Sequence, residues 1–488
     1  MNVFRWIGRA DFWRTALMLA LALATAGYGW SSSEVAGTAY EFSSPGGVVE
    51  RCVALARMPG GEYSDSDAAE ETRLCAIDFN GGRFAVCPKV FSTSPGTLVY
   101  DLEGGAFAGE PRRFEEQKCI AGGVVKDAVA GPPISFKMSV NGRSTSATFA
   151  NSAFVYYHFA RYFGATAHVP VAVFRSMDRD EHRKRVSARG LALSNGKSSL
   201  RMNHAAWQIL HDVAGNPEAY SPREELFARD GQVYGVLLHP TGARYNEAVN
   251  GTRASGWGEG QNRDLQQTAP YLALRSGEPL EAAIDAALAE AMKNPVLAKA
   301  TRPDARPVQI AYWMSDLIDI TLLDFILGQQ DRVGNIDYLN FWYWADGDRV
   351  LRRAAVGRTA PPDIAARNPV LLKRTELGDN DAGVRVSYAN FAKRTGMLDR
   401  LRHYRASVYQ RLMALHGDFE AKGPLYAIVR DSYGLSEREL AQVVANTAAA
   451  ASILHAQCAA GQLRFDVEAE ELLLRGKVEP RSIDCGTP

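Results

Sequence analysis

The segment from Gln309 to Phe341 constrains the fold of this chain more than any other stretch. Apolar side chains recur at three- and four-residue steps from Ile310 to Leu327, which predicts a core helix with one apolar stripe. Gly328 stands where a helix C-cap glycine belongs. The aromatic run from Phe341 to Trp344 then predicts a strand that ends at an Asp346-Gly347 turn. A short loop is therefore expected between a core helix and a strand.

That loop carries a closely spaced carboxylate, guanidinium and amide: Asp331, Arg332 and Asn335. Farther along, an apolar run leads into a second polar group, Asp379-Asn380-Asp381. An ordinary loop ion pair would also explain Asp331-Arg332, and it contributes at most about 1 kcal/mol when exposed. The recurrence of a second carboxylate motif downstream favours a functional site over that explanation.

The two motifs in this order resemble the catalytic and metal loops of protein-kinase-like phosphotransferases. Asp331-Arg332 resembles the loop of those variants that have Asp-Arg in place of His-Arg-Asp. These are the secretory-pathway kinases related to the Golgi casein kinase and four-jointed, and more distantly the phosphatidylinositol kinases. Asp379-Asn380 resembles the Asp-Asn-Gly with which those families bind a metal.

The resemblance implies a role for each matching residue. Asp331 would orient and deprotonate an acceptor hydroxyl, while Asn335 and Asp379 would hold Mg²⁺ or Mn²⁺ with bound ATP. Asn335 lies one position nearer the aspartate than in the lipid-kinase pattern, and Asp381 is the alternative metal ligand. The Pro361-Pro362 stretch between the motifs reads as an insertion, so the chain must fold back for Asp331 and Asp379 to meet.

An earlier strand, helix and strand resemble the small lobe of the same kinases: 134–140, 151–163 ended by Gly164, and 169–174. In that resemblance Lys137 binds the nucleotide phosphates and a helix glutamate orients it. Ala153 stands where that glutamate would fall. Another carboxylate therefore pairs with Lys137, or the chain is a catalytically impaired relative. Taken alone, Lys137 also fits an ordinary lysine on an edge strand.

Together these patterns predict an α+β, two-lobed kinase-like fold with a small β-rich segment stapled by disulfides. The expected divisions are a signal peptide at 1–26, the β-rich cysteine segment at 27–130, the small lobe with insertions at 131–270 and a helical large lobe at 271–488. A strand at 232–238, a loop at 256–260, and helices at 205–213, 281–293, 397–416 and 437–457 complete the prediction. The last helix opens with a Ser436 to Glu439 capping box.

A basic stretch follows the second small-lobe strand: Arg175, Arg179, His182, Arg183, Lys184, Arg185 and Arg189. A solvated loop is one interpretation of this stretch. The other is a patch that captures an anionic substrate or a nucleotide phosphate.

The N-terminus and the cysteines indicate export. Arginines precede an apolar core at 16–26 that closes in Ala24-Thr25-Ala26, which is typical of a secretory signal peptide; an uncleaved membrane anchor is the alternative. All six cysteines follow it. We expect two disulfides among Cys52, Cys75, Cys87 and Cys119 and a third joining Cys458 to Cys485, in a periplasmic or secreted protein or, in a eukaryote, a secretory lumen; buried free thiols are the alternative.

Charge excludes some partners and leaves others open. The chain has 55 basic and 55 acidic residues, so it has no overall attraction to nucleic acid or to an anionic membrane. Membrane contact is expected only if the N-terminal segment stays uncleaved. The predicted partners are a nucleotide and a hydroxyl acceptor that is a protein, a sugar or a lipid. The alternative function is a non-catalytic pseudokinase that acts as an extracytoplasmic binding or scaffold protein.

Overall fold

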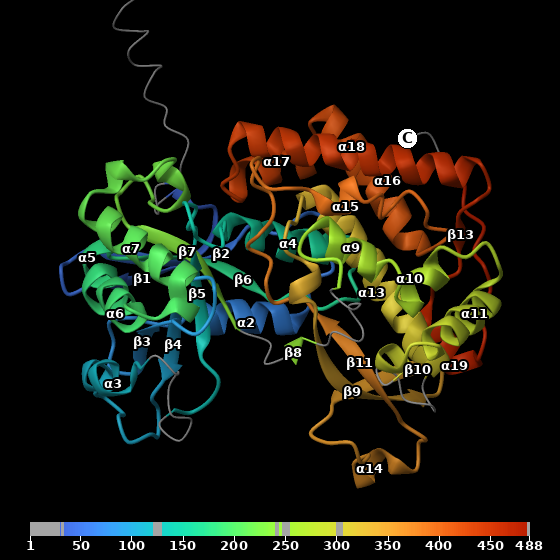
Figure 1. The fold of residues 1–488 in the computed structure, drawn as a ribbon, viewed down its shortest axis with the longest axis horizontal. Coiled ribbons are helices and arrows are strands. Elements are labelled where there is room, and N and C mark those ends of the chain that lie inside the picture. Colours follow the sequence, from blue (N-terminus) through green and yellow to red (C-terminus); the bar gives the residue numbers. More distant parts are fainter. Residues whose placement is uncertain are drawn as a thin grey trace, which may run out of the picture.

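The protein folds into two lobes in the computed structural model (Figure 1). The structure describes residues 30, 34–120, 129–239, 244–245, 254–298 and 306–485. The predicted signal peptide and its cleavage site lie outside the described residues. In the described part of the chain, no helix is both long enough and apolar enough to cross a bilayer.

The small lobe is built on a seven-stranded sheet in the order β1-β2-β6-β7-β5-β4-β3. All neighbouring strands are antiparallel. Strands from the cysteine-containing segment and strands from the segment after it share this one sheet, which gives the former the core that it is too small to form alone. The strands are β1 (Gly37–Ser43), β2 (Val49–Leu55), β3 (Phe84–Pro88), β4 (Thr97–Asp101), β5 (Ile134–Met138), β6 (Ala172–Met177) and β7 (Val233–Leu238).

Strand β6 begins three positions later than the predicted strand at 169–174, and the reason lies at the lobe junction. The His168 N–H donates to Thr375 O, and the Leu377 N–H donates to His168 O. The backbone at His168 is therefore paired with the large lobe, and Pro170 has no N–H to offer a ladder. The sequence prediction of the strand start was wrong for this reason.

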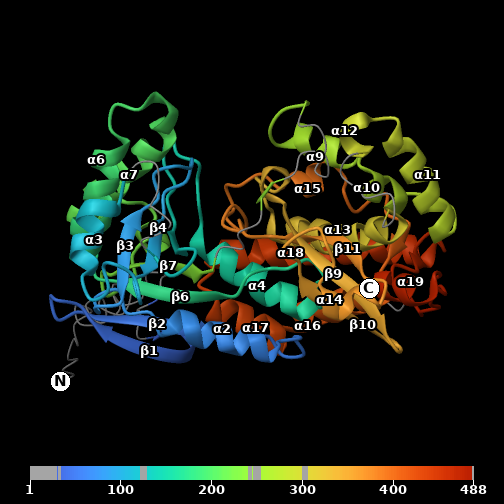
Figure 2. The same ribbon diagram turned by 90° about the horizontal axis from the view of Figure 1, so that it is seen from below.

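Helix α4 (Ala150–Phe163) runs along the junction between the small-lobe sheet and the large-lobe helices (Figure 2). Its side chains are buried on nearly every side, and Gly164 ends it in the left-handed conformation at φ 59°. The predicted helix and its glycine stop are confirmed. Because α4 contacts both lobes, it is well placed to hold them in register.

The large lobe surrounds helix α13 (Arg306–Leu327), which Gly328 ends at φ 64°, as predicted. Helix α18 (Glu437–Ala459) opens with the predicted capping box between Ser436 and Glu439. The predicted helix at 397–416 instead begins at Ala406, because 403–404 forms strand β12 and pairs with β13. His403 Nδ1 contacts Asp466 at 2.8 Å in the buried interior, which holds this segment extended.

A second sheet brings the two predicted motifs together. Its strands are β8 (Arg244–Tyr245), β9 (Asp337–Asp346), β10 (Arg349–Ala354) and β11 (Val370–Glu376), and β9 lies between β10 and β11. Glu376 at the end of β11 pairs with Asp337 at the start of β9. The hairpin and the following insertion therefore fold back, and the loop after β11 lies beside the loop before β9.

The remaining elements cover these layers. In the small lobe they are α2 (Asp65–Cys75), α3 (Pro111–Lys118), α5 (Arg179–His182), the π-helix η3 (Arg183–Ser187), α6 (Ala188–Ser194), the 3₁₀ turn η4 (Ser198–Leu200), α7 (Arg201–Gly215), and the 3₁₀ turns η5 (Pro217–Ala219) and η6 (Arg223–Glu225). In the large lobe they are α9 (Glu259–Leu265), α10 (Ala269–Leu274), α11 (Leu280–Met292), α12 (Pro295–Ala298), the 3₁₀ turn η7 (Val333–Asn335), α14 (Pro362–Ala365), α15 (Phe391–Arg394), α16 (Ala406–Ala421), α17 (Pro424–Ser432), β12 (His403–Tyr404), β13 (Arg464–Phe465) and α19 (Ala469–Arg475). The predicted loop at 256–260 is only partly a loop, because α9 begins at Glu259.

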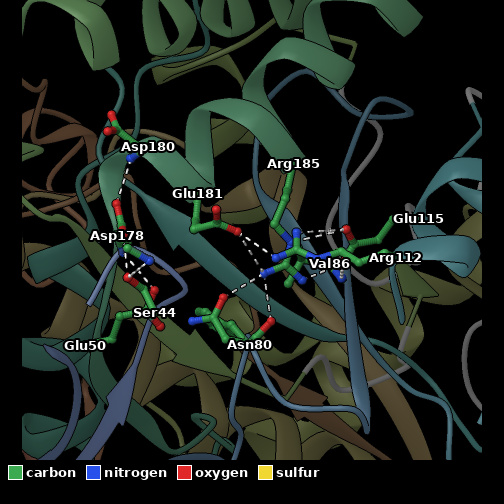
Figure 3. A network of polar contacts seen from close by, with 12 residues as sticks. Ser44, Glu50, Asn80, Val86, Arg112, Glu115, Asp178, Asp180, Glu181 and Arg185 are labelled. Carbon is green, nitrogen blue, oxygen red and sulfur yellow. Dashed lines mark hydrogen bonds and ion pairs between the residues drawn. The ribbon is translucent and has the colours of Figure 1, made fainter. Parts of the chain in front are cut away.

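The basic stretch begins within β6 and continues as helix, and part of it is buried, so the solvated-loop interpretation was wrong for Arg175 and Arg185. Arg175 is fully buried and pairs with Glu50 at 3.1 Å. Arg185 is 6% exposed and its Nη2 contacts Glu115 at 2.6 Å, in the network of Figure 3. Arg183 and Lys184 remain exposed.

The disulfides fall in the two groups that the sequence predicted, and the structure decides the pairing within the first group. Cys52–Cys75 ties β2 to the end of α2, and Cys87–Cys119 ties β3 to the end of α3. Cys458–Cys485 ties α18 to the C-terminal segment. Two bridges within the first group and one in the last pair are confirmed, and the free-thiol alternative is wrong.

Candidate active site at the junction of the lobes

Lys137 of β5 lies against two carboxylates that follow β11. Its Nζ forms an ion pair with Asp379 Oδ1 and lies 3.4 Å from Asp381 Oδ2. Gly235 of β7 lies opposite this part of β5, and a Cβ there would meet Lys137 O at 2.1 Å. Only glycine allows the two strands to approach so closely beside the lysine. The structure thus joins the small-lobe residue Lys137 to the large-lobe motif.

The three charges at this contact alter one another's ionisation. Burial lowers the pKa of Lys137, but the two carboxylates outweigh it and hold the pKa above its usual value. Lys137 holds the pKa of Asp379 well below its usual range. Burial, together with the negative charge of Asp379, raises the pKa of Asp381 to about 6 although Lys137 opposes the rise.

Asp379 and Asp381 differ in their access to solvent. The side chain of Asp379 is 39% exposed, and that of Asp381 is 7% exposed. The backbone of Asp381 is also fixed, because its carbonyl accepts the Phe149 N–H at 2.7 Å just before α4 begins. Asp379 is therefore the carboxylate that an incoming ligand meets first.

Asp331 follows the end of α13, as predicted. Its Oδ1 accepts a hydrogen bond from Trp257 Nε1 at 2.9 Å, and its backbone carbonyl accepts one from Asn335 Nδ2 at 2.7 Å. Burial raises the pKa of Asp331, the Trp257 hydrogen bond opposes the rise, and the charge of Asp379 adds to it. The structure therefore brings Asp331 within electrostatic range of Asp379.

Arg332 pairs with a buried residue of α13 and not with its neighbour Asp331. Its Nε donates to both oxygens of Asp324, at 3.1 and 3.0 Å, and its Nη2 donates to Asn380 Oδ1 at 2.8 Å. Tyr156 of α4 donates its hydroxyl to the same Asp324 at 2.8 Å. Arg332 thus ties the Asp331 loop to α13, α4 and the Asp379 loop, and a simple Asp331–Arg332 loop ion pair is not what the structure contains.

The position of the missing helix glutamate is occupied by Ala153, which is 4% exposed on α4. Asp381 instead supplies the second carboxylate beside Lys137. The sequence indicated Asp381 as an alternative metal ligand, and its contact with Lys137 was not foreseen. The close spacing of Asp379 and Asp381 is the sequence signal that could have suggested it.

Two further residues at the site were missed. Lys89 opens the loop between β3 and β4, and its charge lowers the pKa of both Asp379 and Asp381. Trp257 lies in the segment 256–260, which the sequence predicted to be a loop. The position of Lys89 directly after an apolar strand was a signal that could have identified it. The sequence around Trp257 offers no such signal.

The donor atoms present suit a hard cation. Asp379, Asp381 and Asn335 offer carboxylate and amide oxygens, the ligands that Mg²⁺ and Mn²⁺ favour. No group of three or more His, Cys, Asp or Glu side chains among the described residues is already arranged to hold a metal ion. Lys137, with its positive charge, neutralises the two aspartates in this arrangement. These residues are therefore chemically suited to bind a metal ion. On binding it, Asp379 and Asp381 would give up part of their contact with Lys137.

Comparison with known proteins adds a resemblance of overall fold. Neither a family profile nor a curated protein sequence matches the chain. Among solved structures, the chain is similar to the Golgi casein kinase with Mn/ADP bound, at TM-score 0.41 and 11% identity over 92% of this chain and 91% of that one. A second structure of the Golgi casein kinase gives TM-score 0.40 and 11% identity over 94% of both chains. The structure of hydra Fam20 with sugar gives TM-score 0.38 and 13% identity over 81% of this chain and 91% of that one. Two of these are structures of the Golgi casein kinase and one is of a Fam20 protein, and they are among the solved structures to which the two-lobed chain is similar.

Proposed function

We propose that the protein is an exported kinase-like phosphotransferase that moves the γ-phosphate of ATP to a hydroxyl acceptor. The observation that carries this proposal is the convergence of Lys137 from the small lobe with Asp379 and Asp381 from the large lobe, beside Asp331. Phosphoryl transfer depends mainly on positioning and on neutralising charge, so few residues of fixed type are needed.

Each residue has a distinct role in this reaction. Asp331 accepts the proton of the acceptor hydroxyl, whose oxygen bonds to the γ-phosphorus while the bond from that phosphorus to the β–γ bridging oxygen breaks and ADP leaves. Lys137 binds the nucleotide phosphates. Asp379, with Asn335 and Asp381, would hold Mg²⁺ or Mn²⁺, and the cation would supply positive charge for the phosphates.

The acceptor is a protein, a sugar or a lipid hydroxyl. The balanced charge of the chain disfavours nucleic acid as a partner. Three disulfides are the state expected in an oxidising compartment, which supports a periplasmic or secreted location.

One observation favours a second function, a pseudokinase that binds a nucleotide or a partner without catalysis. Ala153 leaves Lys137 without a carboxylate from α4, so Lys137 pairs with the two aspartates proposed to hold the metal. If the ion pairs persist in the bound state, the site binds but does not transfer.

The test combines binding with transfer. Thermal unfolding is measured with ATP, ADP and GTP, each with and without Mg²⁺ or Mn²⁺, because a ligand at about a hundred times its Kd adds about 2.7 kcal/mol to the free energy of unfolding. Transfer from labelled ATP to a panel of proteins, sugars and lipids is measured in parallel. Metal-dependent stabilisation with transfer supports the kinase, and stabilisation alone supports the pseudokinase. If no combination of nucleotide and divalent cation stabilises the protein, nucleotide binding is contradicted.

A further inference from the structure

Trp257 contacts the proposed base Asp331 from a separate segment of the large lobe. Its Nε1–H donates to Asp331 Oδ1 at 2.9 Å. The indole is nevertheless 60% exposed, so burial in the core does not hold it there. An exposed tryptophan that reaches a carboxylate of the site calls for a local explanation.

The loop around Trp257 is anchored on both sides. Before it, the Ser255 N–H and hydroxyl donate to Asp264 of α9, at 3.1 and 2.8 Å. After it, Gly258 O accepts a hydrogen bond from Asn262 Nδ2 at 3.0 Å. Helix α9 therefore holds the backbone on either side of the tryptophan.

The indole ring itself packs on Phe391. The two ring centroids lie 5.2 Å apart in an edge-to-face arrangement. Gly258 has φ +78°, and a Cβ there would meet the Phe391 ring at 2.7 Å. A side chain at this position would push the loop off Phe391, so glycine is required for the indole to stay in place.

These contacts hold one oxygen of Asp331 in a fixed direction. A general base must lie within hydrogen-bond reach of the proton that it accepts, and a carboxylate on a short loop rotates about its side-chain bonds unless a neighbour fixes it. Asn335 contacts the backbone carbonyl of Asp331, and Arg332 is engaged by Asp324. Trp257 donates its hydrogen bond to the carboxylate itself, where the Asn335 side chain is a further, smaller influence.

We propose that Trp257 is a positioning residue that orients the Asp331 carboxylate for the acceptor hydroxyl, through the hydrogen bond from its indole and its packing on Phe391. This inference rests on the proposed phosphotransferase function. Trp257 acts through Asp331 and has no part in binding the nucleotide or the metal.

The kinetic test uses Trp257→Phe, which keeps an aromatic ring for Phe391 and removes the N–H donor. We expect kcat to fall about 10- to 100-fold, the size of a lost hydrogen bond to a charged group, with the KM for ATP within about twofold of the wild type. In an Asp331→Asn background the same change should have little further effect, because the group that Trp257 orients has lost its function.

Trp344→Phe is the matched control. Trp344 lies on β9, and its Nε1 has no hydrogen-bond partner among the described residues. The same change in chemistry there should leave kcat unaltered. An unchanged kcat in Trp257→Phe, or an equal loss in the Asp331→Asn background, would overturn the proposal.

A second measurement needs no activity. The indole N–H resonance that disappears in Trp257→Phe is followed by NMR in Asp331→Ala, where the acceptor is gone. A clear shift supports the contact, and an unchanged resonance overturns it. If wild-type protein transfers no phosphate, the proposed function fails on that result, while the resonance still decides whether Trp257 engages Asp331.

Discussion

Lys137 and Asp379 form an ion pair across the two lobes although 242 positions separate them in the chain. The contact needs the β10–β9–β11 sheet to fold back on the end of α13, and it needs β5 to present its lysine toward the junction. It is the arrangement from which the proposed chemistry and the first two predictions follow.

Asp331→Asn should keep the fold and nucleotide binding while phosphate transfer falls by orders of magnitude. The change removes the base and leaves Lys137 and the Asp379–Asp381 pair in place. Labelled-ATP transfer and nucleotide affinity are measured on the same preparation. Equal transfer in the variant and the wild type would remove Asp331 from the mechanism.

Asp379→Asn should weaken metal-dependent nucleotide binding itself, because the metal loses its most accessible anionic ligand and the phosphates keep their charge. Lys137→Ala should weaken binding and transfer to an intermediate degree. Lys197→Ala, at an exposed lysine of the small lobe outside the basic stretch, is the matched control and should change neither. Nucleotide affinity with and without Mg²⁺ separates these cases, and a normal metal dependence in Asp379→Asn would contradict the assignment.

Arg332→Met should destabilise the protein by about 3 to 5 kcal/mol, because it leaves Asp324 buried without its counter-charge. Replacing both partners, as in Arg332→Met with Asp324→Leu, should recover much of that loss, since no uncompensated charge remains. Urea unfolding of the two variants provides the comparison. A double variant as unstable as the single one would show that packing, and not charge, is what Arg332 supplies.

His182→Leu should make the protein less sensitive to acid. His182 is fully buried, and burial lowers its pKa from 6.5 to about 3. In the unfolded chain the imidazole takes up a proton below about pH 6.5 while the folded protein does not, so stability is present above that pH and is lost as pH falls toward 3. At pH 4.5 this one group costs about 2 to 3 kcal/mol relative to pH 7, and the variant should escape that loss.

The measurement for His182 is urea unfolding at pH 7 and pH 4.5. An identical loss between the two pH values in wild type and His182→Leu would refute the explanation.

Replacing Cys52 and Cys75 together by alanine should lower the free energy of unfolding by about 3 kcal/mol, because the bridge closes a loop of sequence separation 23 and restricts the unfolded chain.

Mass spectrometry of exported protein under non-reducing conditions should show three bridges and a chain that starts near Gly27. Six free thiols would contradict both the stabilisation and the export argument.

Local patterns in the sequence determined the elements whose causes are themselves local. The apolar stripe from Ile310 to Leu327, the glycine stops at Gly164 and Gly328, and the capping box at Ser436 each act through residues within a few positions, and the structure contains all of them. Cysteine positions were enough to predict two bridges in the first group and one between Cys458 and Cys485, but which of the first four cysteines pair was decided by the tertiary structure.

Tertiary structure alone decided which charges meet. The sequence placed Lys137, Asp331, Asp379 and Asp381 on suitable elements, but whether a side chain is buried, and beside which partner, depends on strands and helices far away in the chain. The sequence pattern placed Arg175 and Arg185 in a basic patch because it does not show that Glu50 and Glu115 lie buried beside them in the folded protein. The same holds for Trp257, whose contact with Asp331 arises only because α9, Gly258 and Phe391 bring its indole there. Backbone propensity is read from neighbours in sequence, whereas electrostatic pairing and burial are set by neighbours in space.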